Sequence, residues 1–369
     1  MRTKLWMLGV AVAALTSCTQ SEVMDIAQGT NIEFESFLGK SSRADYSNVA
    51  SVMLKGAGPA ENDLKQFWVY GSVDADINSN DNPALFSNTV VYWDVNNSAF
   101  TYAQHKQWYE GVYNFAAYSN GNYKLESGVT ADLADRKMSF TDYINNGNND
   151  LVAAIPATII KNETNMSQGV SLDFKHMLAC IELKFTNATT AFALDFTDVK
   201  FSAVSKGNCV YNADSSTPIV WTPSTAPQDI SVYDFKTNDY NLDDSDDTNN
   251  NPLVMLAPGQ FARLYCFVIP QDNEEIELTF NIKSYERKNP TGTGENIIYE
   301  YHYTGVKSYK ASLKVAENGT DYLWKPGRLY RYSADAVGSV HYINFSVSSI
   351  DNWNATGNDV ESSLNPGEI

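Results

Sequence analysis

Histidine, cysteine and long apolar runs are scarce in this chain, and each shortage argues against a class of function. The 369 residues include only 4 histidines and 4 cysteines. The histidines form no HExxH motif and no i, i+4 pair, and the cysteines form no close pairs, so the usual zinc-binding patterns are missing. The GxSxG, P-loop and GxGxxG motifs are missing as well. We therefore predict a protein without a metal, a cofactor or an enzymatic activity.

Basic residues are also few. There are 26 Lys and Arg against 44 Asp and Glu, which gives a net charge of −18. A surface of this sign repels phosphate backbones, so we expect no nucleic-acid partner.

The apolar runs are too short to span a bilayer, and the first of them lies at the start of the chain. Arg2 and Lys4 precede the 11 apolar residues 5–15, which predicts a signal peptide over residues 1–17. Leu15-Thr16-Ser17-Cys18 then resembles a bacterial lipobox, in which the Cys18 thiol takes the lipid and becomes the mature N-terminus. An ordinary secretory signal with an incidental cysteine is the alternative. Thr19 follows Cys18 in place of Asp, so retention in the inner membrane is not signalled.

The remaining cysteines, Cys180, Cys209 and Cys266, are odd in number and widely spaced. We predict buried thiols, with one disulfide plus a free cysteine as the alternative.

The chain is rich in the residues that favour strands, with 22 Tyr and 17 Phe, and turn residues recur about every ten positions. This pattern predicts an all-β protein made of two β-sandwich domains. A polar stretch near residues 161–169 places the domain boundary, giving domains at 44–166 and 167–353 and a polar tail at 354–369. Residues 170–186 alternate strongly, with Met177, Ala179, Ile181, Leu183 and Phe185 on one face, and predict a strand. Residues 125–138 would hold a short helix at most.

The segment before the first domain carries two notable features. In residues 31–38, Ile32, Phe34 and Ser36 alternate with Glu33, Glu35 and Phe37, which predicts a strand with one apolar face. Arg43 follows in a Ser-rich loop and is the only Arg between Arg2 and Arg136. Such a residue is a good target for a trypsin-like protease, although a solvated loop residue explains it equally.

Two acidic patterns invite a cation-binding interpretation. Asp74-x-Asp76-x-Asn78-x-Asn80 mimics the start of a calcium loop, but Ser79 and Leu85 stand where that loop requires Gly and Glu. A second run, Asp243–Asp247, is typical of a solvated loop. We interpret both as polar loops.

Several segments in order resemble the fimbrillin family, the lipoprotein-derived subunits of type V pili. They are Phe67-Trp68-Val69-Tyr70, Trp108–Tyr118, Phe174–Ala179 with its Phe-x-His-x-Leu pattern, and Val340–Trp353 with Phe345, Val347, Ile350 and Trp353.

The resemblance implies transthyretin-like topology in both sandwiches and a specific route of assembly. A lipoprotein precursor reaches the outer membrane, and an Arg-specific protease removes its N-terminal segment. Carried onto this chain, residues 18–43 would form the propeptide, cleaved between Arg43 and Ala44. The displaced strand would carry Ile32, Phe34, Ser36 and Leu38, and its groove would accept a neighbouring subunit's donor strand with Ile343, Phe345 and Val347.

Under this interpretation the partners are other pilin subunits, the outer membrane before processing, the protease and a host or bacterial surface ligand. The mature protein would lie in a cell-surface fimbrium. Two alternatives stay open. A glycan-binding surface lipoprotein predicts an exposed row of Trp or Tyr, and a secreted hydrolase needs a carboxylate pair brought together by the fold.

Overall fold

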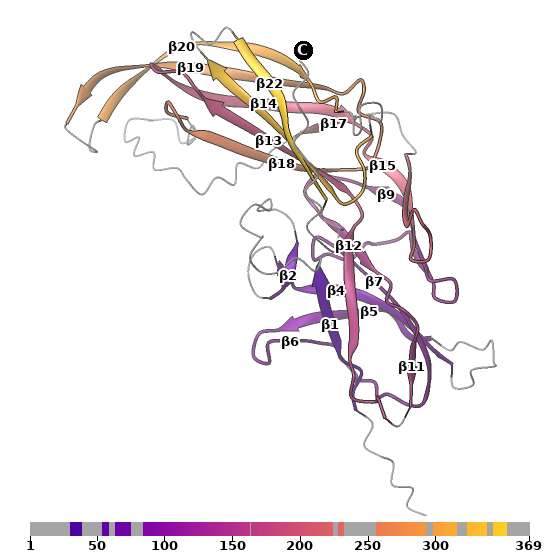
Figure 1. Ribbon diagram of the computed structural model, residues 1–369. Helices are drawn as coiled ribbons and strands as arrows, with labels where there is room; N and C mark the ends of the chain where they lie inside the picture. The colour runs from indigo at the N-terminus through magenta and orange to yellow at the C-terminus, as the bar shows by residue number, and fades with distance from the viewer. Residues whose placement is uncertain are drawn as a thin grey trace, which may run out of the picture.

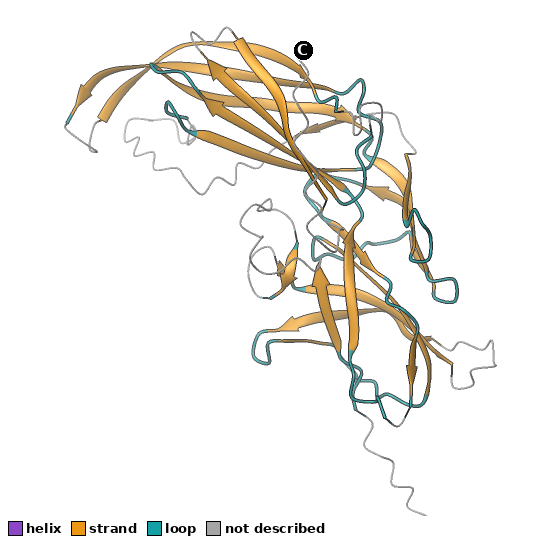
Figure 2. Ribbon diagram, viewed as in Figure 1, coloured by secondary structure: helices purple, strands orange, loops and turns teal. Residues whose placement is uncertain are grey.

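The computed structural model describes residues 30–38, 54–58, 63–74, 84–162, 164–223, 228–231, 256–292, 298–315, 323–337 and 342–352. These residues form β-strands and loops without a helix, which confirms the all-β prediction (Figure 2). The described part of the chain thus contains no helix that could cross a membrane. The strands build two lobes, one above the other in Figure 1.

The lower lobe is built on one large, curved sheet. Its strand order is β1-β12-β10-β7-β4-β5-β6, and β11 also pairs with β7. Their bounds are β1 Phe34–Leu38, β4 Gln66–Asp74, β5 Ala84–Asp94, β6 Ala99–Thr101, β7 Gly111–Asn120, β10 Leu151–Ala154, β11 Ile159–Lys161 and β12 Val170–His176. The short strands β2 (Lys55–Ala57) and β3 (Asp63–Leu64) pair beside it. One face of this sheet holds an aromatic cluster that includes Phe67, Phe86, Phe100 and Phe115.

A four-stranded sheet contributes to the packing against the other face. It has the order β16-β15-β9-β8, with bounds β8 Val129–Asp132, β9 Lys137–Ile144, β15 Lys206–Asn212 and β16 Ile219–Pro223. Trp68 and Tyr118 of the large sheet meet Phe140 and Cys209 in this central cluster, which also takes in Phe267 of the upper lobe. Residues 125–138, expected to hold a short helix at most, contain no helix, because β8 and the start of β9 occupy this stretch as a hairpin.

The upper lobe is a sandwich of two four-stranded sheets. One has the order β18-β13-β21-β22, with bounds β13 Ala179–Asn187, β18 Phe261–Val268, β21 Arg328–Val337 and β22 Tyr342–Asn352. The other has the order β17-β14-β19-β20, with bounds β14 Phe192–Ala203, β17 Gln228–Ser231, β19 Glu277–Thr291 and β20 Ile298–Ser312. Their facing side chains form one core, in which the Phe185 ring lies 4.6 Å from Phe196 and 5.1 Å from Phe280.

The long strand expected over residues 170–186 is two strands in two lobes. β12 pairs with β10 and β1 in the lower sheet, whereas β13 pairs with β18 and β21 in the upper sandwich. The chain crosses between them at Met177 and Leu178, where the Met177 N–H donates to the Leu151 carbonyl at 2.8 Å. β12 therefore completes the lower sheet although it lies beyond the boundary expected at 166/167. That boundary and the transthyretin-like topology stay predictions.

The three cysteines downstream of Cys18 are buried free thiols, as predicted. Cys180 and Cys209 lie in the central cluster and Cys266 in the upper core. Burial disfavours the thiolate, so it raises the pKa of all three, that of Cys266 to about 12. Such thiols are inert packing groups.

Candidate functional site

The strand β1 closes the lower sheet, and its sequence explains why it fits there. Ile32 and Phe34 are 0% and 4% exposed, while Asn31, Glu33 and Glu35 point to solvent. This alternation gives the segment one apolar face, which a half-buried strand requires. β1 pairs in parallel with β12, with Phe34 opposite Val170 and Leu38 opposite Phe174.

The residues just before β1 bond to the opposite edge of the sheet. The Ile32 N–H donates to the Lys106 carbonyl at 2.8 Å, and the Trp108 N–H donates to the Thr30 carbonyl at 3.0 Å. Residues 106–108 follow β6, the last strand in the sheet order. Residues 30–38 are thus bonded to both edges of the lower sheet, and we call them the seam segment.

A tyrosine fixes the entry of the seam segment. The Tyr102 hydroxyl donates to the Ile32 carbonyl at 2.9 Å and accepts from the Lys106 N–H at 3.0 Å. Its pKa is raised chiefly by burial, against the bond from Lys106, so it stays a neutral donor at physiological pH. One buried side chain therefore satisfies backbone groups on both sides of the seam.

Phe34 is the side chain through which the seam segment enters the aromatic cluster. Its ring lies 5.5 to 6.0 Å from four other rings, all but one of them on strands of the lower sheet. These rings belong to Phe67, Phe86, Tyr102 and Phe115. Removal of Phe34 would open the cluster at its centre.

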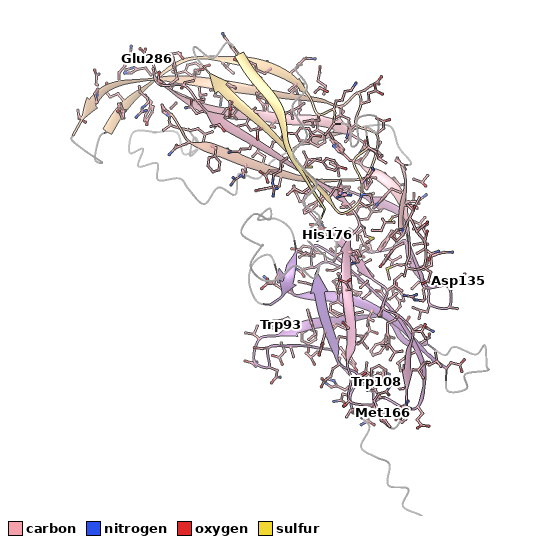
Figure 3. The ribbon with its side chains drawn as sticks, viewed as in Figure 1. Trp93, Trp108, Asp135, Met166, His176 and Glu286 are labelled. Atoms are coloured by element: carbon pink, nitrogen blue, oxygen red, sulfur yellow. The ribbon has the colours of Figure 1, made fainter. Side chains whose placement is uncertain are left out.

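The lower end of the seam is held by polar contacts. The Thr30 hydroxyl donates to the Met166 carbonyl. The Lys161 ammonium donates to the Asn165 and Gln168 carbonyls at 2.8 and 2.6 Å and lies 4.1 Å from the centre of the Trp108 ring. Burial lowers the pKa of Lys161. Trp108 and Met166 mark this end of the molecule in Figure 3.

A buried pair lies at the other end of β12, at the waist between the lobes (Figure 3). The Asp150 carboxylate is 2.9 Å from His176 Nδ1 and accepts the Leu54 N–H at 3.1 Å. The two side chains are 1% and 8% exposed. Asp150 therefore ties the chain that follows the seam segment to the last residue of β12.

The strand proposed as donor forms an edge of the upper sandwich. β22 pairs antiparallel with β21, which places Ile343, Phe345 and Val347 opposite Ala336, Ala334 and Tyr332. On the side of β22 away from β21, no strand of the described part of the chain pairs with it.

Other predicted site residues cannot be placed. Cys18, Arg43, Ala44, Asp76–Asn80 and Asp243–Asp247 lie outside the described residues. Ser36 and Leu38 are described by their backbone pairing alone.

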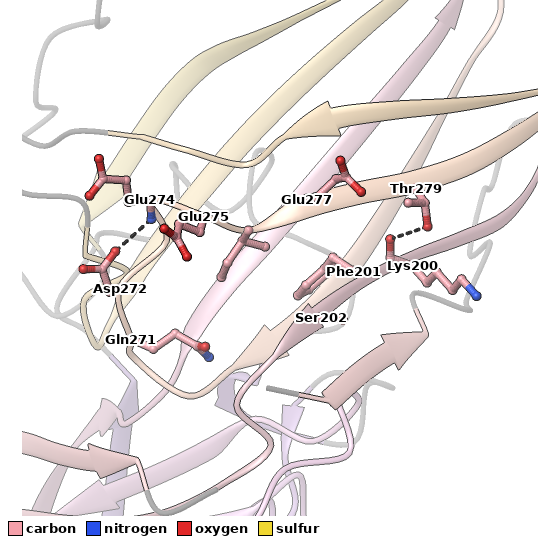
Figure 4. Close-up of a pocket in the computed structure, with 10 residues that line it drawn as sticks. Lys200, Phe201, Ser202, Gln271, Asp272, Glu274, Glu275, Glu277 and Thr279 are labelled. Atoms are coloured by element: carbon pink, nitrogen blue, oxygen red, sulfur yellow. Dashed lines mark hydrogen bonds between the residues drawn. The ribbon is translucent and has the colours of Figure 1, made fainter. Parts of the chain in front are cut away.

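A cavity of about 620 Å³ opens at one end of the upper sandwich. Phe201 and Ile276 form its apolar wall and carboxylates line much of the rest (Figure 4). Those carboxylates are Asp272, Glu274, Glu275 and Glu277. No group of three or more His, Cys, Asp or Glu among the described residues is arranged to hold a metal ion.

Comparison with known proteins identifies the family. Residues 56–353 match the fimbrillin-like family. The chain belongs to the fimbrillin-like family. This membership places it among structural, non-enzymatic proteins. A search of curated proteins returned no significant match.

Solved fimbrial structures are similar to this fimbrillin-like chain at low identity. A fimbrial protein from Bacteroides vulgatus matches at 16% identity, covering 88% of this chain and 99% of its own, with a TM-score of 0.46. The tip fimbrial protein Mfa3 from Porphyromonas gingivalis, with a C-terminal truncation, matches at 10% identity over 79% and 95%, with a TM-score of 0.39. The anchor protein Mfa2 from the same organism matches at 10% identity over 87% and 95%, with a TM-score of 0.29.

Sequence reasoning missed half of the seam in this fimbrillin-like chain. It found the apolar face of residues 31–38 but not residues 106–108, which complete the pairing, nor Tyr102, which bonds to both. No local signal marks either, because the pairing joins segments more than 70 residues apart and strand partners are not encoded by periodicity.

Proposed function

We propose that this fimbrillin-like chain is a pilus subunit that polymerises by strand exchange at the seam. In this proposal the precursor is an outer-membrane lipoprotein attached through Cys18. Cleavage between Arg43 and Ala44 frees the propeptide, and the seam segment leaves. A donor strand from the next subunit then occupies the vacated position.

The observation that carries the proposal is the double pairing of the seam segment. Its departure would leave unpaired backbone groups on β12 and on residues 106–108 at once, and would expose the pocket around Phe34. Unpaired edges beside an apolar pocket are what an added strand recognises. Burial of Ile32 and Phe34 contributes roughly 1.5–3 kcal/mol each, so a donor must bring comparable apolar side chains.

The C-terminal part of the chain offers such side chains. Ile343, Phe345 and Val347 alternate along β22, which has one partner strand among the described residues. An edge strand can leave its sheet by breaking a single ladder, so β22 is the donor that we propose for the neighbouring seam.

The cleavage step is tested with the purified precursor and an Arg-specific protease. We expect the wild-type precursor to lose residues 18–43 and to form polymers, visible by gel filtration and electron microscopy. The Arg43→Ala chain should keep its full length and stay monomeric. Lys40→Ala is the matched control in the same loop and should behave as the wild type.

Two results would overturn parts of the proposal. Normal cleavage and polymerisation of Arg43→Ala would remove Arg43 from the mechanism. Complete cleavage of the wild type without polymers would instead refute strand exchange at the seam.

A further inference from the structure

We propose that the outer face of β19 and β20 binds an acidic oligosaccharide, that is, a glycan whose sugar units carry carboxylates. The site lies at the far end of the upper lobe, near Glu286 in Figure 3, away from the seam. It does not depend on strand exchange.

The register of the hairpin brings aromatic side chains to one face. Phe280 and Ile282 point into the sandwich core, so the alternate residues Tyr285 and Arg287 face outward. A bulge on β20 then sets Tyr303 opposite Tyr285 and Tyr301 opposite Arg287. Tyr299 follows on the same face. We call this set of five residues the tyrosine platform: Tyr285, Arg287, Tyr299, Tyr301 and Tyr303.

The platform has a buried floor and an open top. Tyr285 is 9% exposed and packs on Ala193, with Tyr301 against them. Tyr303 is 58% exposed, and its ring lies 5.6 Å from that of Tyr285. The exposed Tyr303 ring on this firm base offers a face for stacking together with a hydroxyl for hydrogen bonds. Both suit a sugar ring, which has an apolar face and a polar rim.

Arg287 is the charged group of the platform and lacks an anionic partner among the described residues. Its guanidinium carbon lies 3.8 Å from the centre of the Tyr299 ring, and its Nε–H has no hydrogen-bond acceptor. Neighbouring cations differ, since Lys288 pairs with Glu286 at 2.9 Å and Lys283 with Asp195 at 3.6 Å. A guanidinium stacked on a ring is oriented for bidentate bonding to a carboxylate.

The hairpin carries more basic than acidic residues, although three of its lysines pair with carboxylates: Lys283 with Asp195, Lys288 with Glu286 and Lys310 with Glu277. β19 and β20 together carry five basic residues and three acidic ones, within a chain of net charge −18. The basic residues are Lys283, Arg287, Lys288, Lys307 and Lys310, and the acidic ones are Glu277, Glu286 and Glu300.

The shape of the surface favours a glycan over a protein. A protein partner anchors itself through side chains set into pockets, and the cavity of about 620 Å³ lies elsewhere, beside Lys200 and Thr279. The platform offers the exposed Tyr303 ring, with the part-buried Tyr299 and Tyr301 on the same face. A linear sugar acid, which lays successive rings and carboxylates along a surface, matches it better.

The probe is hexagalacturonate, titrated calorimetrically into the purified, unpolymerised protein, with the neutral cellohexaose and a short polyglutamate for comparison. We expect hexagalacturonate to bind and the other two to bind at least about tenfold more weakly. Arg287→Ala should weaken hexagalacturonate binding about tenfold or more, because it removes a charged hydrogen bond. Tyr303→Ala should weaken the same binding about three- to tenfold.

Matched controls come from exposed tyrosines elsewhere. Tyr109 and Tyr123 are 63% and 64% exposed on the lower lobe, so Tyr109→Ala and Tyr123→Ala should leave binding unchanged. Circular dichroism and protease-triggered polymerisation should stay normal in every variant, which separates this proposal from the assembly mechanism.

Several results would overturn the proposal. Absence of hexagalacturonate binding, or equal binding by Arg287→Ala, refutes the site. Equal binding of polyglutamate shows that charge alone acts, and equal binding of cellohexaose refutes the carboxylate requirement. Self-association of the wild type that Arg287→Ala abolishes, without glycan binding, would assign the platform to a second copy of the chain.

Discussion

The two lobes differ in how they hold the strand that each could exchange. In the lower lobe, β1 has five residues, and the seam segment is bonded to β12 on one side and to residues 106–108 on the other. In the upper lobe, β22 has eleven residues and one described partner, β21. The seam segment thus has backbone partners on both sides, whereas β22 has one described backbone ladder.

This difference assigns the two strands to different roles. Loss of the seam segment would open two edges and an apolar pocket together, so the lower lobe is suited to accept a strand. Loss of β22 would open the edge of one sheet, so the upper lobe is suited to donate one.

The largest effect is expected at the centre of the seam. Phe34→Ala in the uncleaved chain should lower the free energy of unfolding of the lower lobe by about 3–5 kcal/mol, because it leaves a cavity among four rings. Urea unfolding monitored by tryptophan fluorescence measures this change.

Its control lies in the same sheet. Tyr92 is 44% exposed on β5, and Tyr92→Ala should change the stability by no more than about 0.5 kcal/mol. After cleavage at Arg43, the Phe34→Ala and wild-type chains should become identical in stability, since the seam segment has left both. A difference that persists would show that Phe34 stays bound after cleavage.

A smaller effect is expected at the waist. Asp150→Asn keeps the shape but replaces a charged acceptor of the Leu54 N–H and of His176 by a neutral amide. Leaving a buried group without its partner costs about 1–3 kcal/mol. Hydrogen exchange should show faster exchange at Leu54 in the variant, while the Ile32 amide on the seam remains protected. Equal protection at Leu54 would contradict the tie between Asp150 and the chain after the seam.

The sequence predicted a strand where apolar and polar residues alternate, within residues 31–38, and β1 occupies Phe34–Leu38. It predicted one strand for residues 170–186, because no Gly, Pro or Asn marks the crossing. The crossing does coincide with a shift of the apolar positions, from Leu172 and Phe174 before it to Met177 and the alternate residues after it. The change of lobe there is decided by tertiary pairing. Periodicity does not record which sheet a strand joins.

Residues 125–138 show how tertiary packing outweighs a local helix preference. The turn between β8 and β9 contains Leu133, Ala134 and Arg136, which are good helix formers. Arg136 adopts a φ of +48°, a conformation usually taken by Gly or Asn. Packing of Met138 and Phe140 into the central cluster outweighs the local preference. The platform was missed for a related reason, since its alternating tyrosines resemble core residues until the register shows which face they occupy.

As the pH rises, the upper core and the waist should lose stability at a lower pH than the aromatic cluster. Burial raises the pKa of Cys180, Cys209 and Cys266 above that of an unfolded thiol, near 9. Above that pH the unfolded chain loses these protons while the folded chain keeps them, so stability falls as pH rises. Each thiol contributes at most about 1.4 kcal/mol per pH unit.

Urea unfolding at pH 8, 9 and 10 tests this dependence. The aromatic cluster around Phe34 contains no cysteine, so the loss between pH 9 and 10 should concentrate in the upper lobe and waist. Cys209→Ala should reduce the loss of unfolding free energy per pH unit by about the contribution of one thiol, whatever its effect on stability at pH 8. An unchanged slope would contradict the contribution of the buried thiol.

The smallest effect is expected on the surface of the upper lobe. Lys310 and Glu277 pair at 2.7 Å between β20 and β19, but their side chains are 71% and 52% exposed. Solvent and salt screen such a pair, so Lys310→Ala should cost less than about 0.5 kcal/mol, with little further change in the Lys310→Ala, Glu277→Ala double variant. A coupling energy above about 1 kcal/mol in that double-mutant cycle would contradict this expectation. The expected result has a structural reason: β19 is fixed by its ladder with β14 and by Phe280 and Ile282 in the core. A hairpin held from beneath in this way can change its outer charges and rings without unfolding, whereas the seam cannot lose Phe34 at so small a cost.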